Sequence, residues 1–373
     1  ASILYFDGEI SKRRIISTHD SYEEKQYNEA TRDRTVLLPK TGKGKEKKLS
    51  GSVLEARQAN GVYCEVDSLG RIFIGDFYNQ TTLDDTRWEQ EFKRDTPQRE
   101  ISDVVAEFIK TSPSTHLTDI DQFKNSKRKH CKFKPGDYFS FKVGRTKYGF
   151  GRVLLDIDKL RKKSAIAQDH GLFWIMGKPV LVKIYAYISE NNEIDIALLE
   201  RVASLPSSYM LDNLLLYGQF EIIGHQDLKS EEIDLPMSYG RHVGAYKFAS
   251  FLQWGLIHRE LPSKTFDKYT NADNPFVAAN SHSRHVHNPY GFYAIGFYPY
   301  HCSLYEIETA IAGYDKDGQY FPGGYRSHFD LRNPANKKIR EELMTVFGLD
   351  PEKSYDDNCV LTGTISSKTL MTL

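Results

Sequence analysis

The clearest strand signal in this chain lies at residues 132–158, KFKPGDYFSFKVGRTKYGFGRVLLDID, and predicts a β-hairpin. A Pro-Gly-Asp sequence at 135–137 ends whatever element comes before it. Residues 138–143 then alternate aromatic and polar side chains, a Gly-Arg-Thr turn follows at 144–146, and residues 148–155 return. We therefore place this hairpin at the centre of the fold.

The hairpin has two distinct sides, because side chains of a strand alternate between its faces. One face of the first strand holds Phe139, Phe141 and Val143, and the other holds Tyr138, Ser140 and Lys142. On the return strand, Tyr148, Phe150, Arg152 and Leu154 share a face. Gly149 and Gly151 leave the opposite face bare, which is typical of a bulge, a bend or a close backbone approach. We expect an α+β, β-rich fold, with a strongly bent antiparallel sheet or small barrel around the central hairpin and flanking helices.

Composition excludes several classes of protein. A chain of 373 residues is long enough for two or three domains. Its 50 basic and 50 acidic residues give a formal net charge of zero, which argues against a dedicated nucleic-acid binder and against a polybasic membrane anchor. No apolar run reaches the roughly 20 residues that span a bilayer. The four cysteines form no CxxC pair, so we expect free thiols and a cytoplasmic location.

An N-terminal domain is predicted at residues 1–125. Residues 49–78 indicate a three-stranded meander with turn residues at each corner. A helix is predicted at 96–111, where Thr96 can cap and Pro97 suits the first helical position. The polar, basic segment 124–134 then marks a domain boundary.

A middle domain is predicted at 130–240 and a C-terminal α+β region at 241–373. Residues 177–190 alternate as a strand, residues 218–226 indicate a further strand, and residues 194–209 between them fit either a strand or a short helix. In the last region, Ser303 and Glu306 form a capping-box pattern. Asn333 and Pro334 open a final helix.

The hairpin carries a family resemblance. The order Pro135-Gly136-Asp137-Tyr138-Phe139, a turn, and then Tyr148-Gly149-Phe150-Gly151-Arg152-Val153-Leu154 resembles the immunity protein 26 family. An apolar strand that ends in an aromatic residue follows in that family, and Val180 to Tyr187 take this place here. The resemblance covers about residues 132–225. The chain differs from that family in length, since about 130 residues lie on each side.

The resemblance implies a function without catalysis. Proteins of this family belong to bacterial polymorphic toxin systems and protect the producing cell by neutralising a toxin. The implied partner is a cognate protein toxin, and the implied protein is neither an enzyme nor dependent on a cofactor. Tight interfaces concentrate affinity in aromatic and arginine side chains on a pre-formed surface. Tyr138, Tyr148 and Arg152 are therefore the candidate binding residues, although the same face can equally be core.

A histidine cluster supports a rival hypothesis. His282, His285 and His287 lie within six residues, and in an extended segment the last two project to the same side. Neutral imidazoles at this spacing can bind zinc, and a three-histidine site with an open position activates water. The alternative function is therefore a histidine-metal-dependent hydrolase, with Asp267, Asp273 or Asp315 as a further ligand. The same segment also fits a polar surface loop.

The lysine-rich segments at 40–48 and 124–134 allow three interpretations. Either segment fits a solvated connector. Residues 124–134 also fit a contact with an acidic partner. Nucleic-acid binding through both segments is a third function, against which the zero net charge argues.

Overall fold

The computed structural model describes residues 2–7, 11–17, 22–27, 43, 45, 61–76, 78–86, 96–168, 170–173, 177–241, 249–262, 265, 268, 307, 308, 311 and 331–372. The chain divides into two compact units, Ala1–Asn60 and Gly61–Leu373. The domain boundaries predicted near residues 125 and 240 both fall inside the second unit and stay a prediction.

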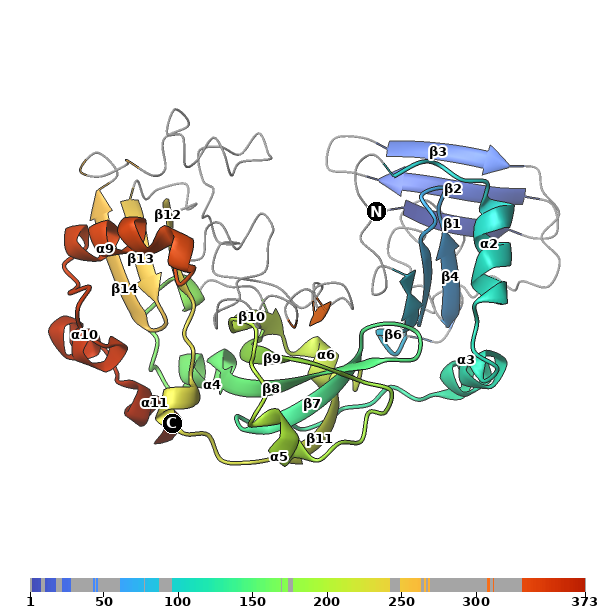
Figure 1. Cartoon of the computed structure of the whole chain (residues 1–373). Helices are drawn as coiled ribbons and strands as arrows, with labels where there is room; N and C mark the ends of the chain where they lie inside the picture. The colour runs from blue at the N-terminus through green and yellow to red at the C-terminus, as the bar shows by residue number, and fades with distance from the viewer. Residues whose placement is uncertain are drawn as a thin grey trace. The chain divides into compact units, whose positions relative to one another are not determined.

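The first unit holds one antiparallel sheet, in the order β1-β2-β3 (Figure 1). Its strands are β1 (Ser2–Asp7), β2 (Ser11–Ser17) and β3 (Tyr22–Tyr27). The sequence did not predict these strands, because charged residues interrupt the alternation of apolar side chains on which such a prediction depends.

The second unit opens with a meander of β4 (Val62–Val66), β5 (Ile72–Asp76) and β6 (Thr81–Asp85). Helices α2 (Ile101–Lys110) and α3 (His116–Asn125) contribute Val104 and partly buried residues to its apolar side. Two of the predicted strands correspond to β4 and β5. The earliest predicted strand lies outside the described residues, and the polar strand β6 was not predicted.

The predicted helix at 96–111 begins later than expected. Its N-cap is Glu100, so Thr96 and Pro97 lie outside the helix. The Arg99 N–H donates to the Ser68 carbonyl at 2.6 Å. This bond ties the segment before α2 to the turn between β4 and β5.

A five-stranded antiparallel sheet forms the middle of the second unit, in the order β10-β9-β8-β7-β11 (Figure 1). Its strands are β7 (Asp137–Lys142), β8 (Tyr148–Asp156), β9 (Pro179–Ser189), β10 (Ser208–Leu211) and β11 (Glu221–His225). The predicted hairpin is β7–β8, and the two predicted later strands are β9 and β11. The short helices α4 (Ile157–Lys162), α5 (Ile196–Leu199) and α6 (Asn213–Leu216) connect the strands. The segment that fitted either a strand or a helix contains both α5 and β10.

The predicted alternation is confirmed on both faces of this sheet. Phe139, Phe141 and Val143 lie in one buried cluster, and Tyr138 and Phe150 lie in another. The bare glycines accommodate the phenylalanine rings of the neighbouring strand. A Cβ atom on Gly149 would lie 2.7 Å from the Phe141 ring, and one on Gly151 would collide with the Phe139 ring.

The strongly bent sheet or small barrel that was expected is not confirmed by the described strands. The sheet is open, with β10 and β11 at its two edges, and no closed barrel is found among the described residues. The pairing of β8 with β9 shifts register between Gly149 and Gly151 and again between Val153 and Leu155. The glycines therefore mark a local irregularity and make room for aromatic rings.

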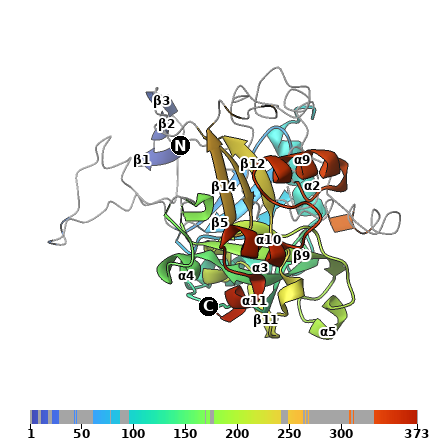
Figure 2. The same cartoon turned by 90° about the vertical axis from the view of Figure 1, so that its left-hand side faces the viewer.

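The last part of the second unit packs a helix against a small sheet. Its strands are β12 (Met237–Arg241), β13 (Ala249–Trp254) and β14 (Ile257–Pro262). Helix α9 (Lys337–Val346) lies along this sheet in both views (Figures 1 and 2), and its Leu343 and Met344 share a buried cluster with strand residues. This is the helix that Asn333 and Pro334 were predicted to open.

Two further helices complete the chain, α10 (Tyr355–Thr362) and α11 (Ser367–Thr372), and neither was predicted. The helix predicted from Ser303 lies largely outside the described residues. None of the helices that the structure describes has the length and hydropathy to cross a bilayer.

Candidate binding site

Arg152 lies at the centre of the hairpin and is almost completely buried, with 1% of its surface exposed. It sits in β8 opposite Tyr138 of β7, and its guanidinium lies 4.6 Å from the centre of the Tyr138 ring. Nη2 donates to the carbonyls of Gln226 and Asp227 at 2.8 and 3.2 Å, and Nη1 donates to the Glu232 carboxylate. A strand residue thus binds three points of one loop, which fixes the loop against the sheet.

Tyr138 reinforces the same attachment. Its side chain is fully buried, its ring stacks on Tyr185 at 6.1 Å, and its hydroxyl donates to the Gln226 side chain at 3.0 Å. Burial raises the pKa of the Tyr138 hydroxyl, so this group stays a neutral donor. Tyr148 is only partly buried and packs at the edge of the same cluster.

The negative charge of Glu232 offsets the positive charges of Arg152 and Lys183. Arg152 pairs in register with Lys183 of β9, and like charges opposite one another destabilise a sheet. Burial lowers the pKa of Lys183, while the nearby Glu232 carboxylate acts in the opposite direction. Glu232 also accepts the Lys229 N–H at 2.7 Å, and it ends the 3₁₀ turn Ser230–Glu232. The Glu232 carboxylate therefore has two roles: it neutralises the Arg152 charge, and it shapes the loop.

The attached loop exposes polar side chains to solvent. We define the binding loop as residues 225–232. Its exposed members are His225, Gln226, Asp227, Lys229 and Glu231. His225 extends the support of this loop, since Nδ1 lies 2.7 Å from the buried Asp137 carboxylate and Nε2 lies 3.2 Å from Asp227. The loop is thus held both by Arg152 and by Asp137.

A cavity of about 320 Å³ adjoins the binding loop. Its apolar lining comes from Leu154, Leu155, Leu160, Leu228 and Leu370. Its polar lining comes from Lys134, Asp156, Lys159, His225 and Asp227. A lining that combines apolar and charged side chains suits an anchor pocket in a protein interface.

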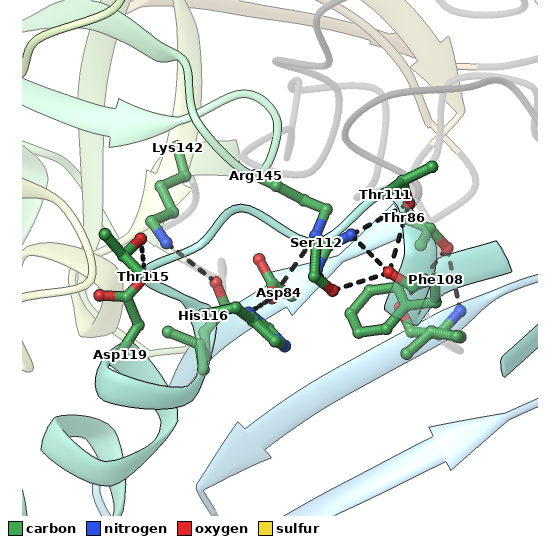
Figure 3. Close-up of polar contacts among 12 residues, drawn as sticks. Asp84, Thr86, Phe108, Thr111, Ser112, Thr115, His116, Asp119, Lys142 and Arg145 are labelled. Carbon is green, nitrogen blue, oxygen red and sulfur yellow. Dashed lines mark hydrogen bonds and ion pairs between the residues drawn. The ribbon is translucent and has the colours of Figure 1, made fainter. Parts of the chain in front are cut away.

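The far end of the hairpin is held by a second arginine (Figure 3). The Arg145 guanidinium stacks on the Phe108 ring at 3.8 Å, and it donates to the Phe108 carbonyl at 3.0 Å and to the Ser112 hydroxyl. The buried Asp84 carboxylate lies between Arg145 and His116, at 3.9 and 3.4 Å. Burial lowers the pKa of His116 despite the nearby Asp84. Both ends of the hairpin are therefore attached to other elements.

The three predicted binding residues lie close together, but not as an exposed patch. Tyr138 and Arg152 are buried under the binding loop, and Tyr148 is partly buried. Direct contact between a partner and either buried side chain would require the loop to move. The sequence did not indicate the role of the loop, because Arg152 and its carbonyl partners lie more than 70 residues apart in the chain.

The predicted metal ligands lie outside the described residues. This holds for His282, His285 and His287 and for the three aspartates considered with them. Among the residues that the structure describes, no group of three or more metal-binding side chains comes together. Cys64, Cys131 and Cys359 have free thiols, and Cys302 is not described.

Comparison with known proteins connects this region to one family. Residues 134–249 match the family model for Immunity protein 26. The match contains the hairpin, Arg152, the binding loop and β12. No curated protein and no solved structure matches the chain.

Proposed function

We propose that this protein is an immunity protein that binds and neutralises a bacterial protein toxin. The observation that carries the proposal is the family match over residues 134–249. Such a protein acts by occupying a surface of its toxin, so it needs no catalytic group of its own. The proposal places the protein in the cytoplasm of a bacterium that carries a polymorphic toxin system.

The proposed contact surface consists of the binding loop and the adjoining cavity. A loop that is already fixed loses little conformational entropy when it binds, which favours affinity. Arg152 and Tyr138 of the sheet supply this rigidity through bonds to Gln226 and to Glu232 of the loop. In this proposal Arg152 and Tyr138 are positioning residues, and Tyr148 lies at the margin of the surface. The leucine-lined cavity would receive an apolar side chain of the toxin.

Co-expression tests the proposed function directly. The toxin encoded beside this gene is expressed in a host that lacks its own immunity, with and without the full chain. We expect growth only where the chain is present. An unrelated toxin of the same kind is the control, and the chain should give no protection against it. Failure to protect against the neighbouring toxin would contradict the proposal.

The histidine-metal hydrolase has no comparable support. Its three histidines lie outside the described residues, and the family match does not include them. We therefore do not propose it as a second function.

A further inference from the structure

We infer that residues 124–134, here called the basic strip, form a second interaction surface that binds an acidic segment of a partner protein. The strip carries five lysines and one arginine, and no acidic residue lies between Asp121 and Asp137. Lys124, Lys127, Lys129, Lys132 and Lys134 are all exposed. This inference rests on the proposed function, because the partner it describes is the toxin.

The strip is held in place although most of it belongs to no helix or strand. The Asn79 side-chain amide donates to the Ser126 hydroxyl at 2.8 Å, and the Cys131 N–H donates to the Leu216 carbonyl at 2.7 Å. The Arg128 guanidinium lies 4.2 Å from the centre of the Tyr217 ring. Phe133 packs against the main buried cluster of the sheet. The backbone of the strip is thus fixed while its lysines point to solvent.

The lysines of the strip lack the ion pairs that several other exposed lysines form. Lys159 pairs with Asp156, Lys162 with Asp158 and Lys337 with Glu341. In the strip, none of the five lysines forms an ion pair with another residue that the structure describes. A chain with zero net charge therefore concentrates an unbalanced positive field along one short segment.

The chemistry of the strip favours an acidic protein over a nucleic acid. Successive outward residues of an extended segment lie roughly 7 Å apart, a spacing that carboxylates of a second extended segment can match. Sequence-tolerant binding of single-stranded nucleic acid uses aromatic side chains on which bases stack. Here Phe123 and Phe133 pack into buried clusters, and Arg128 and His130 lie against the Tyr217 ring. Phe133 of the strip is thus packed away from solvent, and the exposed His130 ring is already in contact with Tyr217.

Fluorescence anisotropy with two labelled probes tests the strip without the toxin. One probe is a decaglutamate peptide and the other is an oligouridine of the same charge, each titrated with the full chain at about 50 mM and about 300 mM NaCl. We expect the peptide to bind more tightly than the oligouridine, and its affinity to fall at the higher salt concentration. Tighter binding of the oligouridine would overturn the inference in favour of a nucleic acid.

A matched pair of triple variants assigns the binding to the strip. The strip variant is Lys127→Gln/Lys129→Gln/Lys132→Gln, and the control is Lys162→Gln/Lys337→Gln/Lys353→Gln, which removes the same charge from exposed lysines elsewhere. We expect the strip variant to bind the peptide about tenfold more weakly, and the control to bind about as well as wild type. Thermal unfolding checks that both variants are folded. Equal peptide affinity in the two variants would overturn the inference.

Growth protection separates this inference from the proposed function. If wild type and the strip variant protect equally against the neighbouring toxin, the strip is not the toxin contact and the inference fails, while the proposed function stands. If wild type gives no protection, the proposed function fails, and the peptide assay alone decides whether the strip binds acidic segments. If wild type protects and the strip variant does not, the result supports both the proposed function and the inference about the strip.

Discussion

Arg152 is the residue on which the candidate site depends. Hydrogen bonds from one buried guanidinium hold the carbonyls of Gln226 and Asp227 and the carboxylate of Glu232. A lysine provides charge without the planar fork that bonds several acceptors at once. Removal of the arginine would leave three partly buried acceptors without this donor, and each such group costs free energy.

We therefore predict that Arg152→Ala destabilises the folded chain by about 2–4 kcal/mol, as measured by urea unfolding. Arg152→Lys should recover only part of this loss. The exposed Arg201→Ala is the control, and it should change the free energy of unfolding by less than about 0.5 kcal/mol. A stable Arg152→Ala variant with an unchanged transition would mean that the loop does not depend on this side chain.

His170 gives the folded chain a pH dependence. Its ring is buried, Nδ1 accepts the Leu172 N–H at 3.0 Å, and Nε2 lies 3.0 Å from the Leu256 carbonyl. Protonation of Nδ1 would point its N–H at the Leu172 N–H, so that two hydrogen-bond donors would face each other. Burial, with His258 as a second cause, lowers the pKa of His170 to about 3. The unfolded chain, whose histidines have a pKa near 6.5, binds this proton first.

The stability that His170 contributes is fully present above about pH 6.5. The free energy of unfolding should therefore fall as the pH falls from about 6.5 toward 3. The slope that this residue adds is about 1.4 kcal/mol per pH unit. Urea unfolding of wild type and His170→Gln between about pH 7 and pH 4.5 measures this pH dependence of the free energy of unfolding. We expect a shallower profile in the variant, with the exposed His130→Gln as the control for loss of a surface histidine. Parallel profiles for wild type and His170→Gln would refute this assignment.

At the scale of elements, the hairpin was predictable because its local signals agree with its tertiary place. Turn residues, alternation and glycines all predict the strands β7 and β8. Sequence pattern also predicted β9 and β11. Strand β6 was not predictable, because its Asp84 and Asp85 are buried charges. Asp84 is stabilised there by His116 and Arg145 and Asp85 by Arg71, all from other parts of the chain.

The ends of helices and the position of the binding loop depend on contacts with residues outside the element itself. Helix α2 begins after Arg99, which bonds the carbonyl of Ser68. Helix α10 lacks an apolar stripe, and its buried Asn358 bonds carbonyls of the preceding turn. The sequence predicted the strand that carries Arg152, but a strand pattern does not indicate which loop will cover it.

The two glycines of β8 allow a test of this packing. A Cβ atom on Gly151 would lie 2.8 Å from Ile184 Cδ1 and closer still to the Phe139 ring. We predict that Gly151→Ala destabilises the chain by about 1–3 kcal/mol in urea unfolding, because the ring must leave its place. Gly224→Ala in β11 is the matched control, since its nearest neighbour would lie at 3.1 Å on the partly buried Ile196 side chain, a looser fit than at Gly151. Equal losses in both variants would argue against the close fit at Gly151.

At the scale of the whole molecule, the family match covers about a third of the chain, and described residues on both sides are joined to it. Arg145 connects the hairpin to residues 84–116. Arg332 connects the C-terminal part to Ser207 at 2.8 Å and to Asp234. The matched region is thus embedded in contacts with its flanks, and the basic strip is itself part of one connection.

The affinity of the purified full chain for the purified toxin encoded beside its gene tests the central claim most directly. We predict a Kd of about 10 nM or tighter, within the range of specific protein inhibitors. The variant Asp227→Lys/Lys229→Glu, which exchanges two exposed charges of the binding loop, should bind at least about tenfold more weakly. The control Lys337→Glu/Glu341→Lys exchanges an exposed pair on α9 and should bind like wild type. Equal affinity of both variants would contradict the proposed surface, and no binding of wild type would contradict the claim that this protein neutralises that toxin.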